Sequence, residues 1–288
     1  MSERGSDAIE RVRAALPGLP VSTAERVEGG WASDSYRVLG NDGVWIAQIG
    51  RAPHEEDLRR QIAILPELAS EVSAPIPELE HADAAVPAMA YRWIAGVACS
   101  ERADLGLWPE RLGRFLYDLH AVPPEFVGLR ARTAAHVLAQ MRADLDRAAS
   151  ETLPLLSASE RSRVEHDWST FVDDDHHWRL APCLVHADLG LEHILVDERG
   201  DLAGVIDWSD VEVGDPAWDF AILLHDLPSQ GERALAAYGG APDAGFLARA
   251  TFAWKFVPFH EVRHGLETGQ DELVARGLAG VRERAGGG

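Results

Sequence analysis

Alternation between apolar and polar positions characterises the first third of this chain. Three runs rich in β-branched and aromatic residues lie between residues 24 and 51, separated by glycine-containing turns, the second of which is the GNDG tetrapeptide. This spacing predicts three strands, the last two paired as a hairpin. Residues 53–70 then follow the helical period of 3.6, and residues 86–96 return to a strand pattern that ends at a glycine.

Helical periodicity dominates the rest of the chain. It is clearest in three segments, residues 109–123, 133–148 and 157–172. The last segment opens with Ser157 and Glu160 at the spacing of a capping box. One stretch, residues 184–210, interrupts the pattern. We therefore predict an α+β protein with a small β-rich N-lobe, residues 1–95, and a larger, mainly helical C-lobe, residues 96–288.

The charge of the chain narrows its possible partners. The formal net charge is −20, from 47 acidic and 27 basic residues. This surplus disfavours a nucleic-acid partner, because phosphate backbones select basic surfaces. Two explanations stay open, solubility alone and attraction of a cationic small molecule.

The cysteine content and the N-terminal sequence bear on the cellular compartment of the protein. The two cysteines, Cys99 and Cys183, lie far apart, and the N-terminus lacks the apolar core of a signal peptide. We therefore predict reduced thiols and a cytoplasmic protein. No apolar run approaches the roughly 20 residues of a membrane span, so no membrane partner is expected. The sequence is compatible with a monomer or a dimer.

The interrupting stretch places histidines and carboxylates among short β runs, LVHADLGLEHILVDERGDLAGVIDWSD. A tight turn at residues 197–201 would pair the two runs, bringing Asp188, ahead of the first, close to Asp207, at the end of the second. His193 opens the first strand on the same side. Phosphoryl transfer needs hard oxygen ligands for Mg²⁺ and a separate carboxylate beside the acceptor hydroxyl. The alternative is a hairpin that merely ends in solvated aspartates.

The stretch continues as VEVGDPAWDFA. Together, HADLGLEH and IDWSDVEVGDPAWDFA resemble the aminoglycoside and macrolide phosphotransferase family, antibiotic kinases with a two-lobed protein-kinase-like fold. Other segments resemble its macrolide and 2″-aminoglycoside branches, namely GGWASDSYRV, LPELASEVSAPIPELE, LHAVP, WSTFVDDDHHW and FHEVRHGLETGQDEL. The resemblance therefore covers nearly the whole chain. It implies ATP or GTP as the phosphoryl donor, Mg²⁺ as cofactor and a small, cationic acceptor.

The resemblance also implies roles for individual residues. Asp188 corresponds to the catalytic aspartate that orients or deprotonates the acceptor hydroxyl. Asp207 matches the metal-binding aspartate, and His193 stands at the metal-side position where most members have asparagine. The residues with implied structural roles, bracing the catalytic loop or capping the next helix, are His186, Asp215 and Asp219.

The N-lobe departs from the family pattern. The cation that usually reaches the nucleotide phosphates from the third strand is replaced by Gln48, and its glutamate partner on the helix by Gln61. Arg51 is the nearest substitute cation, but strand alternation points it to the opposite face from Gln48 unless Gly50 breaks the strand. Nucleotide binding then depends on Mg²⁺ and backbone amides, or on Arg51, or the activity has been lost.

Other candidates on the nucleotide side are less specific. In EGGWASDS, Gly30 would allow the backbone to approach phosphates and Ser33 would hydrogen-bond them, although a plain turn has the same composition. The segment joining the lobes would offer backbone groups to a purine. The residues assigned there are Tyr91, Trp93 and Ile94; Tyr91 has core packing as its alternative role.

On the acceptor side, the acidic candidates are Asp210, Glu212 and Glu261, each of which has simple solvation as the alternative. Three classes of function remain open. The leading one is transfer of the γ-phosphoryl group of ATP or GTP to a hydroxyl of an aminoglycoside- or macrolide-like acceptor. The second is a kinase of the same fold for a metabolite such as choline, homoserine or methylthioribose. The third is an inactive protein that binds nucleotide or drug.

Overall fold

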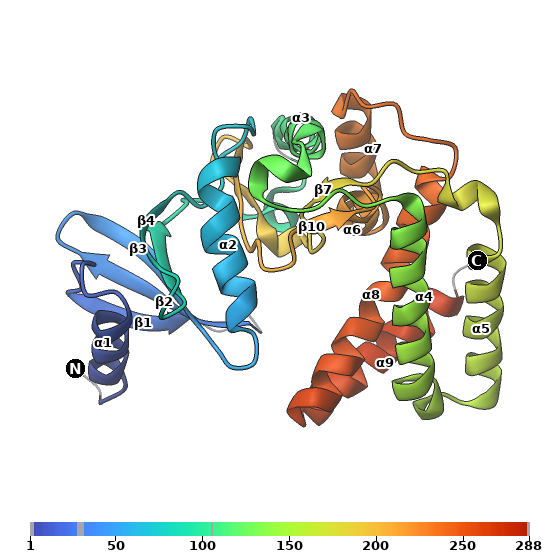
Figure 1. Ribbon diagram of the computed structural model, residues 1–288, viewed down its shortest axis with the longest axis horizontal. Coiled ribbons are helices and arrows are strands. Elements are labelled where there is room, and N and C mark those ends of the chain that lie inside the picture. The colour runs from blue at the N-terminus through green and yellow to red at the C-terminus, as the bar shows by residue number, and fades with distance from the viewer. Residues whose placement is uncertain (1–2, 28–31, 105, 287–288) are drawn as a thin grey trace.

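Two regions of different architecture make up the computed structural model, which describes residues 3–27, 32–104 and 106–286. Figure 1 shows a β-sheet with the N-terminal helix on one side, and a helical region that holds the C-terminal half of the chain. Helix α2 lies between them in this view. The predicted α+β fold with two lobes is confirmed, and residues 93–96, at the predicted boundary, have no regular structure.

The N-terminal region contains one five-stranded sheet of order β1-β2-β3-β5-β4, in which all neighbours are antiparallel. Its elements are α1 (Glu3–Ala15), β1 (Thr23–Val27), β2 (Ser33–Gly40), β3 (Gly43–Gly50), α2 (Glu55–Leu68), β4 (Leu79–Asp83) and β5 (Ala88–Arg92). The sequence pattern missed α1 and β4. Strand β4 is an edge strand without a buried residue, so it shows no apolar alternation.

The two faces of this sheet pack against different partners. Tyr36, Val38 and Ala47 lie on one face in a core shared with α1. Met89 and Tyr91 lie on the other, in a larger core shared with α2 and the C-terminal region. Gln48 pairs with Ser35 and Met89 across the strands, and therefore belongs to this second face.

The C-terminal region begins with β6 (Val97–Ala98), which pairs with the hairpin that carries the candidate catalytic residues. Its other strands and α-helices, with the short 3-10 helix η5 that precedes β8, are α3 (Trp108–Ala121), α4 (Ala134–Glu151), α5 (Ala158–Val172), β7 (Cys183–Val185), η5 (Leu191–His193), β8 (Ile194–Val196), β9 (Leu202–Val205), β10 (Glu212–Gly214), α6 (Trp218–Asp226), α7 (Pro228–Ala237), α8 (Phe246–Thr268) and α9 (Asp271–Gly286). The three predicted helices are confirmed, and Ser157 and Glu160 form the predicted capping box. None of the described helices is both long and apolar enough to cross a bilayer.

Candidate active site

The hairpin formed by β8 and β9 brings the two ends of the conspicuous stretch together. Ile194 pairs with Val205, and just beyond this pair the Ile206 amide donates to the His193 carbonyl over 3.0 Å. The predicted turn is present, since the Asp197 amide donates to the Asp201 carbonyl over 3.0 Å. Residues on either side of this turn therefore become neighbours at the open end of the hairpin, as the alternation of apolar runs predicts.

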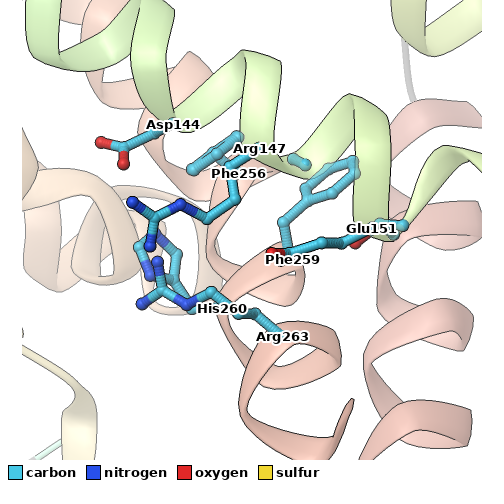
Figure 2. Close-up of a pocket in the computed structure, with 9 residues that line it drawn as sticks. Asp144, Arg147, Glu151, Phe256, Phe259, His260 and Arg263 are labelled. Carbon is cyan, nitrogen blue, oxygen red and sulfur yellow. The ribbon is translucent and has the colours of Figure 1, made fainter. Parts of the chain in front are cut away.

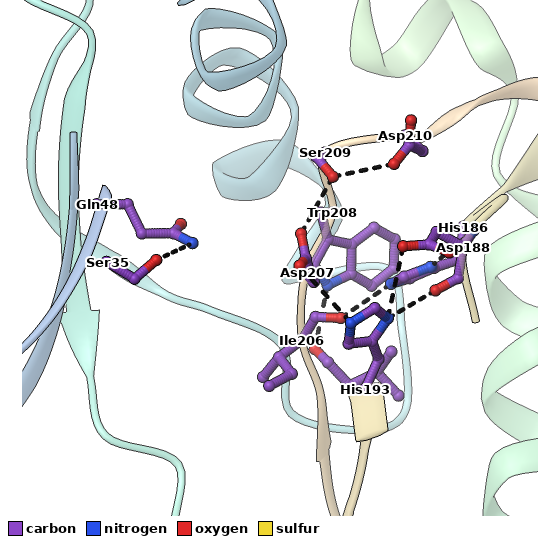
Figure 3. A network of polar contacts seen from close by, with 11 residues as sticks. Ser35, Gln48, His186, Asp188, His193, Ile206, Asp207, Trp208, Ser209 and Asp210 are labelled. Carbon is purple, nitrogen blue, oxygen red and sulfur yellow. Dashed lines mark hydrogen bonds and ion pairs between the residues drawn. The ribbon is translucent and has the colours of Figure 1, made fainter. Parts of the chain in front are cut away.

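His193 lies between the two carboxylates. Its Nδ1 is 3.8 Å from Asp188 Oδ2, and its Nε2 is 3.6 Å from Asp207 Oδ2. Nδ1 also lies 2.7 Å from the Asp188 carbonyl oxygen, to which it donates a hydrogen bond. Figure 3 shows the imidazole between the two aspartates. The convergence of Asp188, His193 and Asp207, predicted from the hairpin, is present in the structure.

His186, which is fully buried, holds the loop that carries Asp188. Its Nε2 lies 3.0 Å from the Ile206 carbonyl, and its Nδ1 lies 3.4 Å from the Asp188 amide. Burial lowers the pKa of His186 to about 4, so the ring is neutral at pH 7. A neutral ring that donates from Nε2 and accepts at Nδ1 satisfies both contacts, which confirms the predicted bracing role.

Two backbone positions at this site are strained. Ala187 and Asp207 have φ values of 68° and 63°, in the left-handed region that non-glycine residues rarely adopt. Ala187 directly precedes Asp188, and Asp207 is itself a candidate metal ligand. Such strain persists only where surrounding contacts determine the backbone, and it is concentrated at functional sites.

Asp219 is one of the contacts that hold the strained backbone at Ala187. Its carboxylate accepts from the His186 amide over 2.9 Å and from the Ala187 amide over 2.9 Å. It also lies 3.0 Å from His120 Nε2, and His120 Nδ1 lies 2.7 Å from the Tyr238 hydroxyl. The first turn of α6 thus fixes the backbone that precedes Asp188, as predicted for Asp219.

Asp215 anchors the segment between β10 and α6. Its Oδ1 accepts from the Ala217 amide over 3.0 Å, and its Oδ2 lies 2.7 Å from Nε of the buried Arg249. Arg249 also holds Asp243. Burial raises the pKa of Asp215, while Arg249 opposes that rise. Asp215 has a structural role, but α6 has no side-chain cap, so the predicted helix cap is not formed. The arginine partner of Asp215 lies 34 positions away and had no sequence signal.

The Asp188 carboxylate is open to an acceptor, with 54% of its side chain exposed. Its pKa is raised to about 6, chiefly because surrounding protein removes solvation from the charged form. His193 opposes this rise, while the negative charges of Asp210 and Asp207 add to it. A carboxylate with this pKa is a stronger proton acceptor than a free aspartate and is still largely ionised at pH 7.

A second acidic cluster continues from Asp207. The Ser209 hydroxyl lies 3.1 Å from Asp207 Oδ1 and 3.1 Å from Asp210 Oδ2, which connects the two carboxylates (Figure 3). Desolvation and the charge of Asp207 raise the pKa of Asp210, as does Asp57 of α2. Helix α2 of the N-terminal region therefore contributes charge to this site. The sequence reading missed Ser209 and Asp57, and for Asp57 no local pattern could have shown it.

Gln48, which replaces the cation expected on the third strand, lies on β3 as predicted. Its amide nitrogen lies 3.5 Å from the Ser35 hydroxyl, and Figure 3 shows both side chains pointing toward the catalytic residues. Gln61 is buried on α2, at 4% exposure. Among the described hydrogen bonds, the partner of the Gln48 amide is Ser35 and not Gln61. The two glutamines therefore do not replace the usual ion pair with an amide pair.

Arg51 is directed to the other side of the strand. Its Nε lies 2.9 Å from Oδ1 of the buried Asp34, which shares a face of β2 with Tyr36. Arg11 of α1 and Arg26 of β1 contact the same carboxylate at 2.9 and 2.6 Å. In this conformation Arg51 belongs to the face opposite Gln48, as strand alternation predicts. Its proposed role toward phosphates stays a prediction.

The remaining nucleotide candidates lie in different surroundings. Ser33 is buried at the start of β2, and Gly30 lies outside the described residues. Tyr91 is buried in the larger core, and burial together with the charge of Asp207 raises its pKa. Trp93 is 43% exposed and its amide donates to the Val44 carbonyl. Ile94 is half-buried next to Gly204 of β9. The purine-binding assignment of these residues stays a prediction.

Two of the three predicted acceptor-binding acids lie near each other, since the charge of Asp210 contributes to the raised pKa of Glu212. Glu212 lies on β10, 3.3 Å from Nη1 of Arg132, and desolvation raises its pKa. Glu261, on α8, is instead paired with Arg276 of α9 at 2.9 Å. Asp144 of α4 also raises the pKa of Glu212, which places a carboxylate missed by the sequence reading near this acid.

The donor set at Asp207 is compatible with Mg²⁺. In the described part of the chain, no group of three or more histidine, cysteine and acidic side chains is arranged to hold a metal unaided. Mg²⁺ commonly takes one or two carboxylates and completes its shell with water and substrate phosphates. Because Nδ1 of His193 donates to the Asp188 carbonyl, its Nε2 lone pair, when neutral, is directed to the side of Asp207. Asp207 therefore fits the role of an oxygen ligand to Mg²⁺, and His193 lies beside it as a nitrogen donor, which Mg²⁺ binds less strongly than oxygen.

The two-lobed fold is kinase-like, and it carries this cluster at the open end of the β8–β9 hairpin. The family model described as "Phosphotransferase enzyme family", APH, matches residues 23–254. The chain belongs to this family. The resemblance and the fold inferred from the motifs are thereby confirmed.

Individual relatives add detail. Viomycin phosphotransferase of Streptomyces vinaceus is 33% identical over 139 residues, 46% of each chain. Matches to the first curated relatives span less than half of their length. The apoenzyme of macrolide 2'-phosphotransferase MphH from Brachybacterium faecium is 25% identical, with a TM-score of 0.76 over 96% of this chain and 98% of that one. The GDP complex of aminoglycoside 2'-phosphotransferase-IIIa has a TM-score of 0.83 and 19% identity, each chain being covered to 99%, which establishes the likeness in fold.

Proposed function

We propose that this protein transfers the γ-phosphoryl group of ATP or GTP to a hydroxyl of a small antibiotic-like acceptor. The observation that supports this most directly is the position of His193 between Asp188 and Asp207, with 3.8 and 3.6 Å separating the facing atoms. One carboxylate is thus available to the acceptor and the other to the metal-bound phosphates, which are the two tasks of phosphoryl transfer.

In this mechanism Asp188 accepts the proton of the acceptor hydroxyl as the oxygen attacks phosphorus. Its raised pKa, about 6, and its open side chain suit that role. His186 and Asp219 hold the loop backbone, so the carboxylate is positioned before the acceptor binds. Mg²⁺, when bound by Asp207 and His193, would neutralise charge on the phosphates.

A second candidate is an inactive protein that binds nucleotide or drug. The presence of Gln48 and Gln61 in place of a charged pair favours it, because neither amide supplies the positive charge that stabilises transferred phosphate. The intact set of Asp188, His193 and Asp207 favours activity. A kinase of the same fold that acts on an ordinary metabolite would need the same two carboxylates, so the acceptor panel must include choline, homoserine and methylthioribose.

The experiment is a transfer assay with labelled ATP and GTP. Acceptors are aminoglycosides, macrolides, tuberactinomycin peptides and the three metabolites, and mass spectrometry detects an added phosphate. Asp188→Asn should lower kcat by about 10²- to 10⁴-fold. Glu198→Gln, an exposed position in the turn of the same hairpin, should leave kcat unchanged. Nucleotide binding without transfer to any acceptor would favour the inactive alternative, and transfer that survives Asp188→Asn would refute the mechanism.

A further inference from the structure

A polar pocket lies between α4 and α8, apart from the catalytic cluster. The pocket is shallow, and the enclosed space that a water-sized group can occupy is about 10 Å³. This is room for about one water molecule. The pocket can therefore receive the end of one small functional group of a larger molecule, and not the molecule itself. The residues that line it are Asp144, Arg147, Ala148, Glu151, Thr152, Phe256, Phe259, His260 and Arg263.

Two arginines from different helices reach toward the same place in this pocket. Figure 2 shows Arg147 of α4 and Arg263 of α8 extending toward the His260 ring. Within the described residues no ion pair involves Arg147, although Asp144 and Glu151 lie about one turn away on its own helix. Arg263 has a carboxylate of Glu267 at 3.9 Å, the long limit of an ion pair. Both guanidinium groups thus have capacity for a further anion.

His260 adds an unsatisfied group. Its Nε2 is buried and has no hydrogen-bond partner among the described residues. Burial and the charge of Arg263 lower the pKa of His260 to about 4, so the ring is neutral at pH 7. A buried polar atom without a partner costs free energy, which a bound ligand oxygen or a water would recover. Phe256 and Phe259 supply the apolar part of the pocket wall.

The pocket adjoins the acidic candidates of the acceptor side. Asp144 lines the pocket, and its negative charge contributes to the raised pKa of Glu212 on β10, so these two carboxylates are close enough to interact. Asp144 is itself held by the Gln140 amide, at 3.3 and 3.2 Å from its two oxygens. The pocket lining thus combines two acids, Asp144 and Glu151, with two arginines, Arg147 and Arg263.

We propose that this pocket binds a carboxylate of the acceptor, and that the acceptor carries both an ammonium and a carboxylate group. This inference rests on the proposed function. The planar guanidinium groups of Arg147 and Arg263 match a carboxylate in shape and charge. Phe256 and Phe259 offer apolar surface beside them. Asp210 and Glu212 take the ammonium group. A polycation without an acidic group would leave both arginines facing positive charge.

Benzoate is a suitable probe, since it combines a carboxylate with an apolar ring, and benzamide is its uncharged match. We expect ligand-observed NMR titration to show benzoate bound at least tenfold more tightly than benzamide. Arg147→Gln combined with Arg263→Gln should weaken benzoate binding at least tenfold. The control Arg142→Gln, an exposed arginine on α4, should not change it. Equal binding of benzoate to the double variant, or equal binding of benzamide, would overturn the proposal.

Two further measurements separate this inference from the transfer reaction. Asp188→Asn should bind benzoate as the wild-type protein does, whatever its effect on catalysis. In the transfer assay, methyl esterification of the acceptor carboxylate should raise KM at least tenfold and leave kcat within twofold. A preferred acceptor without a carboxylate would refute the assignment of the pocket while leaving the phosphotransferase function intact.

Discussion

The Gln48 amide nitrogen lies 3.5 Å from the Ser35 hydroxyl, on the sheet face that is directed toward the catalytic residues. The resemblance implies a cation at this position of the third strand. Gln48 offers the nucleotide phosphates a hydrogen-bond donor, but β3 supplies no positive charge to them. Arg51 does not correct this in the observed conformation, because it contacts Asp34 on the opposite face.

Restoring the charge should strengthen nucleotide binding. We expect Gln48→Lys to lower the Kd for nucleotide about tenfold, because a charged hydrogen bond to phosphate contributes about 1.5–3 kcal/mol, part of which desolvation of the lysine offsets. Adding Gln61→Glu should keep or extend the gain. Ser35→Ala, which adds no charge, should leave Kd within twofold. Calorimetric titration checks these values; an unchanged Kd in Gln48→Lys together with lost binding in Arg51→Ala would show that Arg51 serves the phosphates.

The position of His193 predicts which substitutes are tolerated. Asparagine keeps a neutral oxygen that can face the metal side of Asp207, so His193→Asn should retain kcat within about tenfold. His193→Ala removes the contacts to both Asp188 and Asp207 and should lower kcat about 10- to 100-fold while raising the Mg²⁺ concentration needed for half-maximal rate. Initial rates across a Mg²⁺ titration measure both quantities. Equal rates in the two variants would contradict a metal-side role.

The buried Asp34 predicts a pH-dependent contribution to stability. Hydrogen bonding and positive charge from Arg51, with Arg26 and Arg11, outweigh desolvation and lower its pKa below the ordinary 3.8. A group whose pKa is lowered in the folded state stabilises that state fully above its unfolded pKa, and the contribution disappears as pH falls through the folded pKa. Asp34→Asn should therefore cost about 2–4 kcal/mol at pH 7.

Urea unfolding at several pH values tests this expectation. The difference in unfolding free energy between wild type and Asp34→Asn should be constant from pH 7 to about pH 5 and should shrink below about pH 4. Glu25→Gln, an exposed position on β1, serves as the control and should show no such difference at pH 7. A gap that widens on acidification would contradict the assignment.

Close packing of α3 against α7 makes Gly113 a sensitive position. A Cβ atom built there would overlap the carbonyl oxygen of Ala234, which is backbone and cannot move as a side chain does. Gly113→Ala should lower the free energy of unfolding by about 2–4 kcal/mol, although alanine is the better helix former. Gly128→Ala is the comparison, since it has φ of 75° and open space, and should cost about 1 kcal/mol. Thermal unfolding distinguishes the two costs.

Much of the fold and part of the site follow from local sequence. The strands β2 and β3, the helices α3 and α5, and the hairpin that joins Asp188 to Asp207 were all predicted, because their periodicity and turns act over a few residues. Gln48 and Arg51 lie on opposite faces for the same reason, since alternation along a strand is local. Strand β4 was missed because its exposed edge leaves no apolar alternation. Helix α1 was missed although its buried residues Ala8, Val12 and Ala15 recur at helical spacing.

The sequence alone therefore determined the elements, the two-lobed organisation and the catalytic hairpin, all of which depend on contacts between near neighbours. Tertiary structure decided which distant groups meet. Asp57 of α2 acts on Asp210, Arg249 of α8 holds Asp215, and Arg147 and Arg263 converge on His260. These long-range interactions depend on how whole helices pack. Packing is set by the summed burial of many apolar side chains rather than by any local spacing.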